Sequence, residues 1–125
     1  MLGTNDVKTR FGASPETVMG GIAGLLDLAT GAEMQTRHGG FRILLICPPP
    51  VREAGVLAAD FWGAEAKSRA LPPLYTALAA SRGVAFLDAG QVIAVSPVDG
   101  VHFEAEAHAR LAEAVARAVR TLAST

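Results

Sequence analysis

An aspartate and a histidine stand three residues apart in Asp99-Gly100-Val101-His102, on a turn near the end of the chain. In this spacing a carboxylate can fix the tautomer of an imidazole and stabilise the imidazolium that forms when the histidine takes a proton. The segment therefore predicts a general base, His102, that is oriented by Asp99. The alternative is a structural turn, in which the aspartate closes the turn and the histidine caps the next helix.

A second polar cluster, Gly3-Thr4-Asn5-Asp6, lies at the other end of the chain. We expect Met1-Leu2 to be the tail of a buried strand and the cluster to be the loop that leaves its carboxyl end. The Asn5 amide can donate a hydrogen bond to a developing oxyanion, a role worth roughly two to three orders of magnitude in rate. Taken alone, the cluster is just as well a polar turn, in which Gly3 shapes the loop and Asp6 binds backbone amides.

Together the two clusters resemble the SGNH, or GDSL-type, hydrolase family. That family has a G-x-N-D block whose Asn lines the oxyanion hole, and later a D-x-x-H block that supplies the catalytic Asp and His. LGTND and DGVHF match these blocks in order, and the resemblance covers essentially the whole chain. Lys8, Arg10 and Phe11, with the Cys-Pro-Pro-Pro run at 47–50, are similar to the bacterial arylesterase branch.

The sequence also departs from the family. The G-D-S block with the nucleophilic serine and the block with an oxyanion-hole glycine have no counterpart among residues 1–125. No serine stands in a G-D-S setting; the serines are Ser14, Ser68, Ser81, Ser96 and Ser124. We therefore expect 1–125 to be a single domain, the C-terminal portion of an SGNH hydrolase domain, with Met1 internal to a longer reading frame or an artificial start. Ser96 is expected to be a loop residue near the site.

Composition limits the remaining possibilities. Half of the residues are hydrophobic, 18% are charged and the net charge is -1, which is typical of a folded domain and favours neither nucleic acid nor an anionic membrane as a partner. No apolar run reaches the roughly 18 residues of a membrane span. The single cysteine, Cys47, excludes an internal disulfide and suits a reducing cytoplasm. As a thiol nucleophile for His102 it is less favoured than as a small buried hydrophobe.

Alternating helical and apolar segments must position these residues. We predict helices over 15–37, 63–69, 71–82 and 104–122, and strands over 41–47 and 84–87, with 51–62 left unassigned. Strand–helix alternation predicts a three-layer α/β/α fold with a parallel sheet. The resemblance makes this sheet flavodoxin-like, with the N-terminal strands of the SGNH fold missing. Asn5, Pro48 and the turn at 99–102 all fall at or just after predicted strand ends, where such folds place their sites.

The resemblance implies a carboxylic ester hydrolase acting on small acyl or aryl esters. His102 would be the base, Asp99 its orienting residue and Asn5 the oxyanion donor, with Pro48, Phe61 and Trp62 at a substrate pocket; for the two aromatic residues the alternative is the core. No metal or organic cofactor is implied, and the three scattered histidines lack zinc-site spacing. The expected partner is a small-molecule ester, with no nucleic acid and no membrane.

Two other functions stay open. A catalytically inactive fragment or interaction module could retain the fold, and the missing serine favours this reading for residues 1–125. An unrelated flavodoxin-like binding domain would need phosphate-loop glycines after the first strand, and none are found. Because the expected strands are missing, we also expect an open apolar sheet edge that promotes association, including a homo-oligomer.

Overall fold

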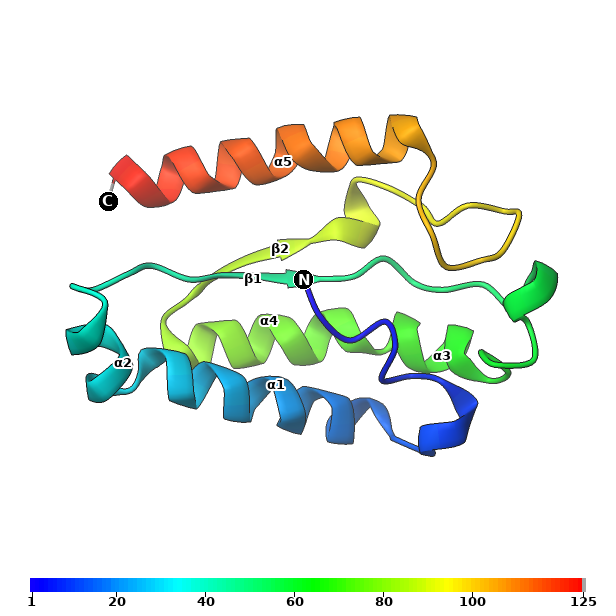
Figure 1. The fold of residues 1–125 in the computed structure, drawn as a ribbon, viewed down its shortest axis with the longest axis horizontal. Helices are drawn as coiled ribbons and strands as arrows, with labels where there is room; N and C mark the ends of the chain where they lie inside the picture. The colour runs from blue at the N-terminus through cyan, green and yellow to red at the C-terminus, as the bar shows by residue number, and fades with distance from the viewer. Residues whose placement is uncertain (125) are drawn as a thin grey trace.

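The computed structural model describes residues 1–124, in which helices lie on both sides of a small parallel sheet (Figure 1). Strand β1 (Leu44–Cys47) pairs in parallel with β2 (Ala85–Asp88), and these are the only two strands in the described part of the chain. Helices α1 (Pro15–Thr30) and α4 (Leu71–Arg82) cover one face. Helix α5 (Ala105–Ser124) covers the other and contacts β2. The predicted three-layer α/β class is therefore confirmed.

The predicted helix over 15–37 is divided into two. It begins as expected, because the Ser14 hydroxyl accepts the Thr17 N–H at 3.1 Å. At Gly31 the backbone becomes extended, with φ -62° and ψ 146°, and the chain restarts as α2 (Ala32–Arg37). The Gly31 N–H still donates to the carbonyl of Leu28, so α1 ends at this glycine and the short helix α2 begins directly after it.

The predicted strand over 41–47 is shortened, whereas the predicted strand over 84–87 keeps its length and begins one residue later. Pairing begins at Leu44 and Ala85, and the carbonyl of Ile43 accepts the Ala85 N–H at 3.1 Å. Residues before Ile43 lie beyond the start of β2 and have no strand opposite them, so the predicted strand over 41–47 loses its first residues. Between the strands lie α3 (Ala64–Arg69) and α4, and short 3-10 turns occur at Thr9–Phe11, Gly55–Leu57 and Ala89–Gln91.

The core lies between β1 and the α1–α4 layer. Alternate residues of β1, Leu45 and Cys47, are buried, as expected where one face of a strand packs on helices. They meet apolar residues at helical spacing on α1 and on α4, which form one cluster: Val18, Ile22, Leu26, Leu71, Tyr75 and Leu78. This layer fixes the sheet on which the loops of the candidate site stand.

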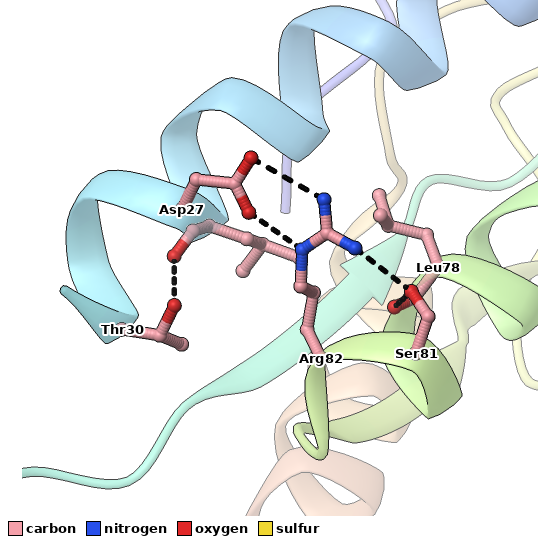
Figure 2. Close-up of polar contacts among 6 residues, drawn as sticks. Asp27, Thr30, Leu78, Ser81 and Arg82 are labelled. Atoms are coloured by element: carbon pink, nitrogen blue, oxygen red, sulfur yellow. Dashed lines mark hydrogen bonds and ion pairs between the residues drawn. The ribbon is translucent and has the colours of Figure 1, made fainter.

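An ion pair ties α1 to α4 near the amino ends of the strands (Figure 2). The Arg82 guanidinium donates through Nε to Asp27 Oδ1 at 2.5 Å and through Nη1 to the Ser81 hydroxyl at 3.2 Å. The hydrogen bond from Arg82 lowers the pKa of Asp27. Both side chains are partly exposed, so the contact fixes geometry more than it adds stability.

The second edge of β1 pairs with no strand in residues 1–124. Met1-Leu2, predicted as a strand tail, has no strand conformation and is about half exposed. A largely apolar hollow of about 190 Å³ runs along this edge, lined by Met1, Leu2, Ile22, Leu26 and residues 43–46. The edge is thus open, and its pairing with another chain stays a prediction.

Candidate active site

The turn at 99–102 folds around the carboxylate of Asp99. Its Oδ1 accepts the backbone N–H groups of Val101 at 2.9 Å and of His102 at 3.0 Å. Its Oδ2 lies 2.6 Å from Nδ1 of the His102 ring. Gly100 allows this tight path because it adopts φ +74°, a conformation that side chains disfavour. Three donors therefore converge on one carboxylate within four residues.

These hydrogen bonds decide the protonation of the pair. The backbone N–H groups of His102 and Val101, followed by the His102 ring, lower the pKa of Asp99 to about 2. At neutral pH Asp99 is thus an anion that can only accept, so the proton of a neutral His102 lies on Nδ1 and the lone pair on Nε2. The His102 side chain is 74% exposed, whereas Asp99 is 22% exposed, so the ring faces solvent.

The loop after β1 interlocks with this turn, backbone against backbone. The Arg52 N–H donates to the Gly100 carbonyl at 2.8 Å. A Cβ on Gly100 would lie 2.1 Å from the Arg52 carbonyl oxygen, and a Cβ on Gly55, at φ +60°, would lie 1.9 Å from that of Val98. The sequence analysis includes Gly100 in the turn but missed Gly55; a glycine inside the unassigned stretch 51–62 was the available signal.

The loop that carries Asn5 reaches the same end of the molecule. Thr9 joins it to the segment after the 3-10 turn, donating its N–H to the Asp60 carbonyl at 2.9 Å and its hydroxyl to the Trp62 carbonyl at 2.8 Å. The three loops gather at the carboxyl ends of the strands, on the right of Figure 1. Within residues 1–124 the Asn5 side-chain amide is exposed and has no hydrogen-bond partner, and no hydrogen bond joins it to His102.

Gly3 shapes this loop, as one of the two sequence interpretations expected. It adopts φ +124°, and a Cβ there would lie 2.5 Å from the Tyr75 hydroxyl. That hydroxyl donates to the Leu2 carbonyl at 3.1 Å, so the buried Tyr75 of α4 holds the start of the loop.

The three residues predicted for a substrate pocket are separated by burial. Pro48 is less than 2% exposed and Phe61 is 1% exposed, which places both in the core and favours the core alternative for Phe61. Trp62 is 68% exposed beside the Asn5 loop. The pocket role stays a prediction, and Trp62 is the member that a ligand can reach in this structure.

Other candidate nucleophiles and ligands are not poised for chemistry. Cys47 is fully buried, and burial together with the Asp88 charge raises the pKa of its thiol to about 12. Ser96 is 5% exposed, and its hydroxyl is hydrogen-bonded to the Glu104 carboxylate. Within residues 1–124 no three His, Cys, Asp or Glu side chains cluster as a metal site would require, and no helix could cross a membrane.

A cavity and the candidate chemistry do not coincide. A hollow of about 400 Å³ lies at the amino ends of the strands, beside Arg42, Arg82 and Gly83. Asp99 and His102 lie after the carboxyl end of β2, at the opposite end of the strands. The candidate site is the carboxylate–imidazole pair, because such a pair can transfer a proton and the hollow contains none.

A three-layer α/β/α fold with a carboxylate–imidazole pair in the loop before its last helix is typical of SGNH/GDSL-type hydrolases. Solved structures agree. A carbohydrate acetylesterase from Sinorhizobium meliloti superposes with a TM-score of 0.90 and 33% identity over 98% of this chain. The aryl esterase of M. smegmatis superposes with a TM-score of 0.89 and 34% identity over 98% of this chain. A putative arylesterase from Agrobacterium tumefaciens superposes with a TM-score of 0.81 and 36% identity over 97% of this chain.

The resemblance to SGNH/GDSL-type hydrolases of the arylesterase-like branch is therefore confirmed. It spans 59% of the Sinorhizobium and M. smegmatis chains and 58% of the Agrobacterium chain. No family model matches the sequence, and no curated protein matches it either.

Proposed function

We propose that residues 1–125 are the C-terminal portion of an SGNH-type serine esterase domain that hydrolyses small acyl or aryl esters. The observation that carries the proposal is the 2.6 Å contact between Asp99 Oδ2 and Nδ1 of an exposed His102 ring. The names of the similar structures, which include an acetylesterase and aryl esterases, support the ester class. The nucleophilic serine would come from a part of the domain outside residues 1–125.

In the complete site each residue has a defined task. Nε2 of His102 accepts the serine proton as the oxygen attacks the ester carbonyl, and the imidazolium returns that proton to the leaving alkoxide. Asp99 stays ionised and stabilises the imidazolium. The unpartnered amide of Asn5 donates to the oxyanion of the tetrahedral intermediate. Water then repeats the sequence on the acyl-enzyme and releases the carboxylic acid.

The expected partner is a small-molecule ester, and no cofactor takes part in any step. Trp62 would contact the acyl or aryl group. The single cysteine favours a cytoplasmic location. The open edge of β1 is the surface at which a second copy would associate.

The test uses a completed domain. The part of the M. smegmatis aryl esterase that precedes its matched region is fused before Met1, and hydrolysis of p-nitrophenyl acetate is measured. We expect activity that a serine-directed inhibitor abolishes, and His102→Ala to lower kcat by about 10⁶. The matched control is His108→Ala, an exposed histidine on α5, which should retain full activity. Near-full activity of a folded His102→Ala would contradict the assignment of the base.

The second candidate is a catalytically inactive module that retains the fold. It is favoured by the absence of a G-D-S serine from residues 1–125. Both candidates predict that 1–125 alone shows no enzyme-like turnover of p-nitrophenyl acetate. They differ for the completed domain, because an inactive completed domain with native folding would favour the module.

A further inference from the structure

Ser96 makes several hydrogen bonds within the loop that carries His102. Its N–H donates to the His102 carbonyl at 2.6 Å, and its own carbonyl accepts the Gly100 N–H at 2.9 Å. Its hydroxyl oxygen accepts the Val98 N–H at 3.2 Å. The residue is 5% exposed. A single buried serine therefore closes the loop 96–102 on itself.

The same hydroxyl connects this loop to the last helix. It forms a short hydrogen bond with Oε1 of Glu104, in which the serine donates because a carboxylate can only accept. The Glu104 carbonyl accepts the His108 N–H at 3.1 Å, which is the first helical hydrogen bond at the start of α5. Since α5 packs on β2, the contact ties the loop to a rigid element of the sheet.

The His102 ring depends on such support. It is 74% exposed, and its one hydrogen bond in residues 1–124 runs to Asp99, a member of the same turn. Packing therefore contributes little to its orientation, and the path of the turn backbone must set it. A charge-assisted hydrogen bond, such as that from Ser96 to Glu104, is stronger than a neutral one and suits this task.

We propose that Ser96 is a positioning residue for His102: with Glu104 it holds the 96–102 loop so that the imidazole keeps its contact with Asp99. This rests on the proposed function of His102 as the base. Ser96 touches no reacting atom in that role. It acts through the turn, and its loss should leave substrate binding almost unchanged.

The experiment compares Ser96→Ala with wild type in the completed domain. We expect kcat to fall about tenfold, the scale of one lost hydrogen bond, with KM changed less than about twofold. In ¹⁵N NMR spectra the fraction of His102 with its proton on Nδ1 should fall. Ser96→Thr, which keeps the hydroxyl, should restore both readouts. Leu78→Val, a core change in α4 away from the loop, should lower the melting temperature without moving either.

Variants of Glu104 test whether Ser96 acts through its hydrogen bond to this residue. Glu104→Ala should reproduce most of the Ser96→Ala loss. Glu104→Gln, which keeps an acceptor but removes the charge, should lose less than Glu104→Ala. Ser96→Ala/Glu104→Ala should be no worse than the worse single variant. Multiplied losses in the double variant, or an unchanged tautomer fraction in Ser96→Ala, would overturn the proposal. If Ser96→Ala does not fold, the exposed Glu104→Ala variant decides alone by the tautomer readout. An active His102→Ala would end the proposed function, yet leave the effect of Ser96 on the tautomer measurable.

Discussion

Two aspartate contacts of almost equal length stand at opposite ends of the sheet. At the amino end Asp27 accepts from Arg82 Nε at 2.5 Å; at the carboxyl end Asp99 lies 2.6 Å from Nδ1 of His102. Their chemistry differs because of the donor. A guanidinium stays protonated in proteins and can only donate to its partner, whereas an imidazole has a second ring nitrogen that can accept a proton. Short distance alone therefore does not identify a reactive pair.

The two pairs also differ in how the chain builds them. Asp99 binds two backbone N–H groups and a ring within its own four-residue turn. The Asp27 contact joins side chains 55 residues apart and exists only because α1 packs on α4. The first pair is formed within one turn, whereas the second depends on tertiary packing.

The largest expected effect separates the two aspartates by activity. In the completed domain Asp99→Asn should lower kcat by about 10⁴, because the amide no longer fixes the tautomer that leaves Nε2 free. Asp27→Asn should leave kcat unchanged and lower the melting temperature only slightly, as for an exposed ion pair. Ester hydrolysis and thermal melting of both variants measure this. Equal losses of kcat would show that Asp99 contributes to folding alone.

The next effect concerns the oxyanion. Asn5→Ala should lower kcat by about 10²–10³, since it removes one donor to the tetrahedral intermediate. Thr4→Ala, in the same loop, is the matched control and should change kcat little. A KM increase with unchanged kcat would instead assign Asn5 to substrate binding.

A smaller effect tests the interlocked loops by comparing glycines at the two ends. Gly55→Ala in the completed domain should lower the free energy of unfolding in two ways. Alanine in a left-handed conformation costs about 1–2 kcal/mol, and the clash of its Cβ with the Val98 carbonyl costs about 1–3 kcal/mol. Gly39→Ala, at φ +68° with no atom within 4 Å of its added Cβ, should cost only the conformational term of a left-handed alanine. Denaturant unfolding compares the two. Equal costs would mean that the Gly55 loop moves freely away from Val98.

These differences also explain what the sequence could predict. Apolar periodicity and turn residues predicted the α/β class, and four adjacent residues predicted the contact between Asp99 and His102. The sequence did not predict the break at Gly31, the Asp27–Arg82 pair or the approach of Gly55 to Val98. Each of these depends on what lies opposite a residue in space, and no spacing along the chain encodes that.

The burial of Pro48 escaped prediction for a related reason, whereas for Phe61 the core was one of two sequence interpretations. Both residues were candidates for a substrate pocket because they follow a strand end or lie in a long loop. Both are buried, while the adjacent Trp62 is exposed. Position along the chain places a residue near a site, but the packing of its neighbours decides which side chain a ligand can reach.

The smallest effect is the acid dependence of stability that each aspartate contributes. The pKa of Asp99 falls from 3.8 to about 2, so the folded state binds fewer protons than the unfolded state between these values. Its stabilising contribution is therefore complete above about pH 4 and is lost as the pH falls towards about 2. The melting-temperature gap between wild type and Asp99→Asn should narrow over this range. The Asp27→Asn gap should narrow in the same direction, because Arg82 also lowers the pKa of Asp27. A gap for Asp99→Asn that stays constant down to about pH 2 would mean that its carboxylate is not held by the turn, and the contrast between the two ends of the sheet would then rest on the donors alone.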